Sequence, residues 1–265
     1  MSNTAKNTQE IPCCGADLTF PDMSNVENPK NPKDTISKEF LNEFETDFKD
    51  FDIGYVNDLT GLFLHDYNSD FSSAIVISIE MYDRILESEI GIEAEKANNE
   101  LYENFGNITY FISDYLRENG FETCVAHPHE EKINFTKIAE RAKMGTVGKS
   151  GLLISPRFGP KQKMSAIFVN IKNLPNSDEN PYLWIRQYCE YCSSCIRKCP
   201  KNALSCNEEN IQSIDEDVCI GCSDGCTECI KVCPFYQKGY EKVYEKFKKM
   251  KAGKRNKCPA NNDFS

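Results

Sequence analysis

The stretch "CEYCSSCIRKCP", which runs from Cys189 to Pro200, indicates what kind of fold this chain contains. Its four cysteines are separated by two, two and three residues, and a proline follows the last of them. In this spacing three thiolates hold one 4Fe–4S cluster, and the fourth thiolate crosses to a second cluster. The proline lacks an N–H and fixes φ where the chain turns away from the first cluster.

A second set of cysteines is therefore expected, and "CIGCSDGCTECIKVCP", residues 219–234, supplies it. By pseudo-symmetry we predict two interleaved sets of four ligands. The first set consists of Cys189, Cys192, Cys195 and Cys233. The second set consists of Cys199, Cys226, Cys229 and one of Cys219 or Cys222, a choice that the sequence leaves open. Residues 186–236 are thus predicted to form a small domain like a bacterial ferredoxin, with two 4Fe–4S clusters.

Zinc is the alternative metal, because C-x2-C pairs also make zinc ribbons and knuckles. A zinc site uses two such pairs, however, and does not need two cysteine sets that both end in Cys-Pro. Ten of the 14 cysteines lie from Cys189 to Cys233, which favours metal ligation over a disulfide framework. The cysteines outside the pattern are expected to be ordinary thiols; they are Cys13, Cys14, Cys124, Cys206 and Cys258.

The composition narrows the class of protein further. The 265 residues suffice for one substantial core and a small second domain. The formal net charge of -10 argues against a general nucleic-acid-binding protein, because neutralising phosphates requires a surplus of Lys and Arg. The start "MSNTAKNTQE" has no secretory h-region, and no apolar run approaches the roughly 20 residues that span a bilayer. We therefore expect a cytoplasmic protein with no membrane partner.

Four regions follow one another along the chain. Residues 1–32 are rich in Asn and Pro, and we predict a poorly ordered polar arm. In residues 33–185, apolar patterns predict helices at 34–48, 98–119 and 133–142 and strands at 72–82, 121–127 and 163–174. Asp34 or Thr35 is the expected N-cap of the first helix, and Gly120 is the expected stop of the second. The mixture suits an α+β or α/β core ahead of the cysteine-rich domain.

The fourth region, residues 237–265, is a basic amphipathic helix and tail. From Lys238 to Lys257 the chain has nine Lys or Arg and two Glu. The simpler interpretation is a solvated helix that packs through Tyr240, Val243, Tyr244 and Phe247. A docking surface for an acidic partner or an RNA is the alternative.

The loop "GTVGKSGLL", from Gly145 to Leu153, resembles the end of a nucleotide-binding P-loop. The full motif requires a glycine five residues before Gly148, and this chain has Lys143 there. The residues before the loop also predict a helix, whereas a P-loop follows a buried strand. We therefore do not predict nucleotide binding and look for another role for the loop.

Residues 138–171, "IAERAKMGTVGKSGLLISPRFGPKQKMSAIFVNI", and the segment "GCTECIKVCPF" resemble the epoxyqueuosine reductases and the related corrinoid-dependent reductive dehalogenases. The resemblance covers about residues 35–236. It implies that residues 33–185 form a sandwich of α/β type, similar to nitroreductases and cobalamin-processing chaperones. It also implies that a cobalamin lies against the glycine loop, and the residues that would contact it are Gly145, Gly148, Lys149, Ser150 and Gly151.

The sequence departs from the family in two respects. The catalytic Asp of the epoxyqueuosine reductases has no counterpart in the matching region "AHPHEEKINF". His129 and Glu130, with His127 beside them, are the predicted proton donors there, because reductive deoxygenation or dehalogenation requires one. A polar turn is the alternative interpretation of these residues; Tyr82 is a further candidate, for which a core position is simpler. The family's tRNA-modifying members also carry a C-terminal helical-repeat extension, so tRNA is not the expected substrate.

The sequence thus predicts an iron–sulfur reductase that takes electrons from a donor such as a ferredoxin or flavodoxin. The electrons would pass through two 4Fe–4S clusters to a cobalamin and then to a small-molecule substrate of unknown identity. The alternative is a ferredoxin-like electron-transfer protein, whose front domain docks a partner or binds a flavin and performs no chemistry.

Overall fold

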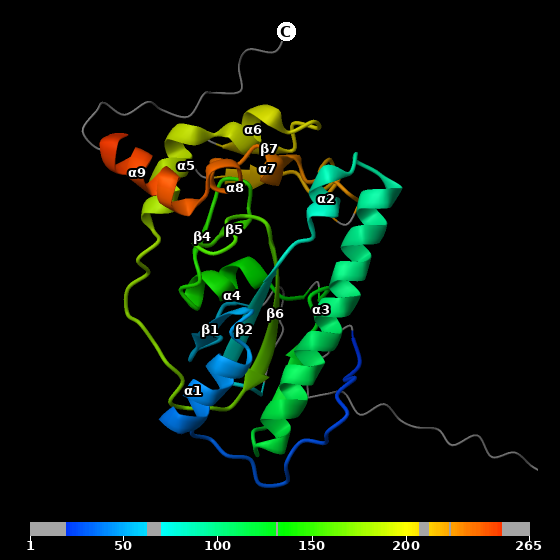
Figure 1. Cartoon of the computed structure of the whole chain (residues 1–265), viewed down its shortest axis with the longest axis vertical. Helices are drawn as coiled ribbons and strands as arrows, with labels where there is room; N and C mark the ends of the chain where they lie inside the picture. The colour runs from blue at the N-terminus through cyan, green and yellow to red at the C-terminus, as the bar shows by residue number, and fades with distance from the viewer. Residues whose placement is uncertain (1–19, 63–69, 131, 207–211, 223, 251–265) are drawn as a thin grey trace, which may run out of the picture.

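A four-stranded sheet forms the centre of the larger domain in this computed structural model, which describes residues 20–62, 70–130, 132–206, 212–222 and 224–250 (Figure 1). The strands lie in the order β1 (Asp52–Val56), β2 (Ser73–Glu80), β6 (Gln162–Val169) and β3 (Thr123–Ala126). Every neighbouring pair is antiparallel. The mixture of helix and sheet is as predicted, and the antiparallel pairing favours α+β over α/β.

Helices cover both faces of this sheet. On one face lie α1 (Lys38–Asp47) and the long α3 (Ile92–Glu118), which pack on Ile75 and Ile77 of β2. On the other face α4 (Phe135–Arg141) packs with Ala74 and Val76. Since successive side chains of a strand point to opposite faces, the continuous apolar run of β2 fills both layers.

The predicted elements of this domain are present with shifted ends. Ser37 is the N-cap of α1, since its side chain accepts a hydrogen bond from the N–H of Phe40; the prediction of Asp34 or Thr35 was wrong. Helix α3 begins at Ile92, before the predicted residue 98, and Gly120 follows its end with φ +89, as predicted. Strand β1 was not predicted.

The N-terminal arm is held to α3 over the part that the structure describes, which differs from the poorly ordered arm that we predicted. The carboxylate of Asp22 lies 2.7 Å from the guanidinium of Arg117, whose side chain is only 3% exposed. Asp114 accepts hydrogen bonds from the backbone N–H groups of Asn25 and Val26. Residues 1–19, with Cys13 and Cys14, lie outside the described residues, as do residues 251–265, with Cys258.

The cysteine-rich elements sit together above one end of the sheet (Figure 1). They are α5 (Trp184–Cys192), α6 (Ser194–Lys198), the pair β7 (Leu204–Cys206) and β8 (Gln212–Ile214), α7 (Glu228–Lys231) and α8 (Pro234–Lys238). Helix α9 (Tyr240–Met250) then packs back through Val243 and Phe247, close to Trp184, which confirms the packed interpretation of the basic helix. The hairpin of β4 (Thr146–Val147) and β5 (Leu153–Ile154) and the short α2 (Asp83–Glu87) lie between these elements and the sheet (Figure 1).

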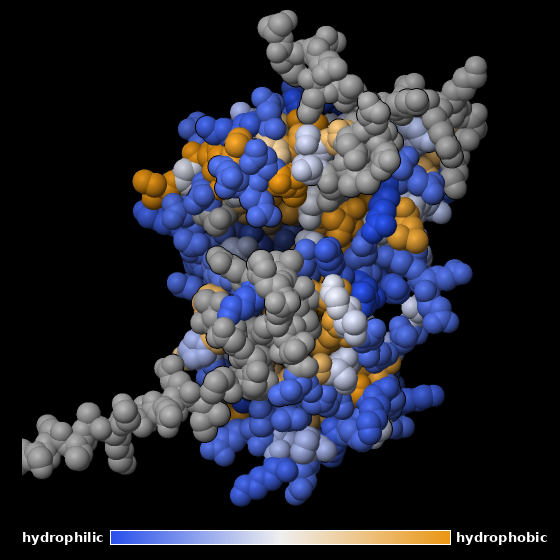
Figure 2. Space-filling model, turned by 180° about the vertical axis from the view of Figure 1, so that it is seen from behind, coloured by the Kyte–Doolittle hydropathy of each residue, from blue (hydrophilic) through white to orange (hydrophobic). Residues whose placement is uncertain are grey.

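The face of the molecule seen in Figure 2 is largely hydrophilic where its residues are described. Figure 2 shows polar side chains over most of the face opposite to that of Figure 1, with apolar side chains in small separate groups. None of the helices in the described ranges is long and apolar enough to cross a membrane.

Candidate functional site

Two short helices and one left-handed residue bring the first three cysteines of the motif together. Helix α5 carries Cys189 and Cys192, and α6 carries Cys195. Between the helices, the buried Ser193 has φ 45 and ψ 23, in the left-handed region. This sharp turn folds the chain back within the C-x2-C-x2-C run, so that three thiols face a common space.

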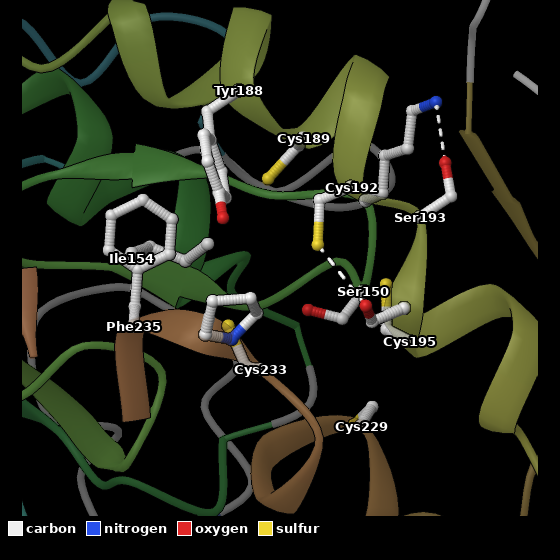
Figure 3. A pocket seen from close by; sticks show the side chains of 13 residues that line it. Ser150, Ile154, Tyr188, Cys189, Cys192, Ser193, Cys195, Cys229, Cys233 and Phe235 are labelled. Carbon is white, nitrogen blue, oxygen red and sulfur yellow. Dashed lines mark hydrogen bonds between the residues drawn. The ribbon is translucent and has the colours of Figure 1, made fainter. Parts of the chain in front are cut away.

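Cys233 completes what we call the first thiol group. Cys189 interacts electrostatically with Cys233, Cys195 and Cys192, and Cys233 interacts with Cys192 and Cys195. Figure 3 shows these four side chains around one hollow, which Tyr188, Ile154 and Phe235 also line. The structure therefore brings together the four residues of the first predicted ligand set. The two that are farthest apart in sequence, Cys189 and Cys233, are separated by 44 positions.

The remaining five motif cysteines form the second thiol group, namely Cys199, Cys219, Cys222, Cys226 and Cys229. Cys226 interacts electrostatically with Cys222, Cys219 and Cys199. Cys229 interacts with Cys222, Cys226 and Cys219, and also with Cys195 of the first thiol group. The two groups are thus adjacent. Cys199 comes from the first half of the motif and lies in the second thiol group, whereas Cys233 comes from the second half and lies in the first thiol group.

The second thiol group distinguishes Cys219 from Cys222, which the sequence did not. Cys219 is exposed, whereas Cys222 is partly buried and packs with Cys229 against Ile230. Among the thiols that act on Cys226 and on Cys229, Cys222 exerts the largest effect in both cases. Cys222 is therefore the better placed of the two to act as a ligand together with Cys226 and Cys229.

The environment of the thiols disfavours their charged form unless a cation is present. Burial raises the pKa of Cys195 to about 11 and that of Cys233 to about 12, and it also raises the pKa of Cys189 and Cys229. Backbone N–H groups oppose this effect: Phe235 and Tyr236 donate to Cys233. Ala203 donates to Cys199, with 3.3 Å between N and Sγ. Such N–H donors are suited to thiolates that carry the negative charge of a metal centre.

Within the described part of the chain, no three His, Cys, Asp or Glu side chains are arranged to hold a single metal ion.

The glycine loop lies against the first thiol group. It forms the turn between β4 and β5, and no helix follows it as one would in a P-loop. The backbone N–H of Lys149 donates a hydrogen bond to the sulfur of Cys189. The Lys149 side chain is buried, with Nζ 3.4 Å from Oγ of Ser193, and it lines the hollow together with Ser150 (Figure 3). Burial lowers the pKa of the Lys149 amine, and Cys189, Glu190, Cys195 and Cys192 act in the opposite direction.

The three glycines of the loop make their close approaches within the protein itself. A Cβ at Gly145 would lie 2.2 Å from the carbonyl oxygen of Ile154, and one at Gly148 would lie 2.6 Å from the Ile154 side chain. At Gly151, where φ is +76, a Cβ would lie 2.4 Å from Ile214. Packing inside this chain therefore accounts for all three glycines, and they do not form an open cradle.

The two predicted proton donors lie in a turn after β3, next to an aromatic and cationic group that the sequence did not reveal. The ring centroid of His129 is 3.8 Å from that of Tyr102 on α3. Nζ of Lys163, from β6, lies 2.8 Å from the Tyr102 hydroxyl, and its side chain is buried. Glu130 is 3% exposed, and one of its carboxylate oxygens accepts a hydrogen bond from the N–H of Lys132.

The neighbouring candidates have other surroundings. His127 stacks on Phe20 with 4.4 Å between ring centroids; burial, assisted by the charge of His129, lowers its pKa to about 4 against the effect of Glu130. The hydroxyl of Tyr82 accepts a hydrogen bond from Asn104 at 3.2 Å, away from His129. Cys124 and Cys206 are disulfide-bonded, so the prediction that they are ordinary thiols was wrong.

Comparisons with known proteins point to one group of enzymes. No protein-family model matches the sequence. Over 157 residues the chain is 24% identical to a tetrachloroethene reductive dehalogenase of Desulfitobacterium hafniense, which covers 59% of this chain and 27% of that protein. It is 33% identical over 132 residues to the uncharacterized ferredoxin-like protein YdhX of Escherichia coli O157:H7, covering 49% of this chain and 53% of YdhX. The chain thus spans about a quarter of the length of the dehalogenase.

Solved structures show the same fold. The catabolic reductive dehalogenase NpRdhA superposes with a TM-score of 0.59 and 17% identity over 74% of this chain and 31% of that chain. An epoxyqueuosine reductase in complex with a tRNA stem loop superposes with a TM-score of 0.52 and 16% identity; the match covers 76% of this chain and 66% of the reductase chain. The predicted resemblance to epoxyqueuosine reductases and reductive dehalogenases is therefore confirmed: the chain is similar in sequence to reductive dehalogenases, and it shares its fold with a reductive dehalogenase and an epoxyqueuosine reductase.

Proposed function

We propose that this chain is an iron–sulfur reductase in which two 4Fe–4S clusters pass electrons to a reactive centre. The first cluster would be held by Cys189, Cys192, Cys195 and Cys233, and the second by Cys199, Cys222, Cys226 and Cys229. The observation that carries the proposal is the pair of adjacent thiol groups, each of which takes one cysteine from the other half of the motif.

The residues present fit such clusters. Their donor set consists of thiols alone, which clusters of this type use, and the thiols lie in a buried environment with backbone N–H donors. Cys195 and Cys229 interact electrostatically and line the same hollow, which supports an electron passing between the two proposed clusters. When bound, each cluster would accept and release one electron at a time.

A corrinoid is the second part of the proposal, and it is supported by the relatives. One similar dehalogenase structure is described as suggesting a mechanism for B12-dependent dehalogenation. At the three glycines of the loop expected to contact the corrin, Ile154 and Ile214 lie where a Cβ would point. Of the five predicted residues, Lys149 and Ser150 line the hollow beside the first thiol group, and these two would be the residues to face a corrin there.

We infer that the group of His129, Tyr102 and Lys163 supplies protons for the reduction. The Tyr102 hydroxyl accepts a hydrogen bond from the Lys163 amine, and its ring lies against the His129 imidazole, so three side chains of the types used in general acid–base catalysis are in contact. Glu130 would keep the turn in place from its buried position. Replacing a carbon–halogen or carbon–oxygen bond by carbon–hydrogen consumes two electrons and one or more protons, so a reductase needs both parts.

The substrate class rests on the relatives. The dehalogenases similar in sequence are named for tetrachloroethene, and one solved dehalogenase holds 3-bromo-4-hydroxybenzoic acid. The epoxyqueuosine reductase neighbour binds a tRNA stem loop. We propose a small molecule as the substrate of this chain, because its net charge of -10 is unfavourable for tRNA.

A second candidate function, electron transfer alone, is favoured by the similarity to the ferredoxin-like YdhX. One experiment separates the two. Anaerobically reconstituted protein is titrated with cobalamin and then supplied with reductant and 3-bromo-4-hydroxybenzoic acid. A perturbed corrinoid spectrum with bromide release supports the reductase. Clusters that cycle between redox states, without corrinoid binding or bromide release, support electron transfer alone.

A further inference from the structure

A groove with a basic rim opens directly beside the first thiol group. Its volume is about 330 Å³, and Cys192 and Tyr191 form part of its wall. Its charged lining residues are Arg197 of α6, Lys238 of α8 and Lys246 of α9. All three cations are exposed, and none of them forms an ion pair with a carboxylate in the described part of the chain. Among the residues that the structure describes, no Asp or Glu lines the groove.

This positive charge is local, because the chain as a whole carries a net charge of -10. The carboxylates closest in sequence to the groove's lysines are on α9: Glu245 is engaged with Lys248, and Glu241 does not line the groove. The floor of the groove is apolar. Val232, Pro234 and Met250 line it, and each of them is partly buried. A patch with unpaired cations around a small apolar floor is complementary to a protein surface with exposed carboxylates.

The position of the groove decides what kind of acidic partner fits. The sulfur of Cys192 would bind the first cluster under the proposed function, and Cys192 lines both this groove and the hollow of the first thiol group. Electron transfer weakens steeply with distance, so an electron carrier gains most by docking where a ligand of the cluster lies near the surface. An RNA fits less well, because phosphate binding draws on many more cations than the three at this rim.

We propose that this groove docks an acidic electron-carrier protein, such as a flavodoxin, and admits its electron to the first cluster beside Cys192. In this step the reduced flavin loses one electron and the cluster gains one, and no covalent bond forms or breaks. The proposal rests on the proposed function, because it needs a cluster at the first thiol group.

The test compares the triple variant Arg197→Gln, Lys238→Gln, Lys246→Gln with a matched control, Lys30→Gln, Lys38→Gln, Lys49→Gln. Both variants remove three exposed positive charges, and the control positions lie on the arm and around α1. Iron and sulfide are measured in each sample first, so that a failure of the proposed function is recognised separately. Reduction of the clusters by purified flavodoxin hydroquinone is then followed anaerobically by stopped flow at low and high salt.

We expect the groove variant to lose about tenfold or more in the second-order rate constant at low salt, and the difference to shrink at high salt. The control variant should change by less than about twofold. Photoreduced deazaflavin, a small reductant that needs no docking, should reduce all three proteins at the same rate. Equal rates with flavodoxin in the groove and control variants would overturn the proposal. So would an unchanged flavodoxin rate combined with loss of tRNA binding in the groove variant.

Discussion

The backbone N–H of Lys149 donates a hydrogen bond to the sulfur of Cys189. This contact joins the glycine loop of the larger domain to the first thiol group of the smaller one. The buried Lys149 side chain extends the junction to Ser193, in the turn between α5 and α6. The loop that resembles a nucleotide-binding motif thus serves, in this fold, as part of the wall around the proposed first cluster.

Lys149→Gln should lower the reduction potential of the first cluster. A buried positive charge stabilises the more negative, reduced state of the cluster, so its removal makes reduction harder. We expect a shift on the order of 50 mV, measured by redox titration followed by EPR. The control is Lys49→Gln, at an exposed lysine beyond the end of α1. An unchanged or higher potential in Lys149→Gln would contradict the expectation that the lysine stabilises the reduced cluster.

Cys222→Ser should remove the second cluster, and Cys219→Ser should leave both clusters in place. Cys222 is the more buried of the two and exerts the larger effect on Cys226 and Cys229. The check is the iron content of anaerobically reconstituted protein: we expect about half the wild-type value for Cys222→Ser and the full value for Cys219→Ser. The reverse pattern would assign Cys219 as the ligand.

The stability of the protein should decrease between pH 6.5 and 4 because of His127. Its pKa falls from 6.5 to about 4 on folding, mainly through burial, so the unfolded chain binds more protons in this window. The contribution to the free energy of unfolding is therefore fully present above pH 6.5 and is lost toward pH 4. With allowance for partial exposure, we expect a loss of about 2 kcal/mol. Denaturant unfolding of His127→Gln should show a weaker pH dependence, and parallel curves for both proteins would contradict this assignment.

Gly106→Ala should destabilise the protein although alanine favours helices. A Cβ at this position on α3 would lie 2.2 Å from Nε2 of His127, so the ring would have to leave its stack with Phe20. We expect a net loss of about 1–2 kcal/mol in the free energy of unfolding. Asn107→Ala, at the exposed neighbouring position, is the control and should be neutral or slightly stabilising. Equal stability of the two variants would mean that His127 moves aside at no cost.

The sequence indicated which cysteines lie near one another, because the spacing within each half of the motif is a local property of the chain. The C-x2-C-x2-C run needs only the turn at Ser193 to converge, and the two Cys-Pro steps identify the residues that cross. The choice between Cys219 and Cys222 was not predictable. It depends on which thiol is buried against Ile230, and thus on how α7 packs.

The sequence failed where distant elements meet. Tyr102 and Lys163 lie on α3 and β6, and nothing in their separate patterns indicated a hydrogen bond between them. The glycines of the loop were expected to face a cofactor, and they approach Ile154 and Ile214 instead, which only the tertiary fold could show. Strand β1 was missed because Asp52 and Gly54 interrupt its apolar pattern.

The central claim is most directly tested by measuring iron and acid-labile sulfide in anaerobically prepared wild-type protein and in Cys195→Ala. The account predicts about eight irons and eight sulfides per wild-type chain and about half of each in the variant, since Cys195 belongs to the first thiol group. Bound zinc without sulfide, or the same iron content in both proteins, would contradict it.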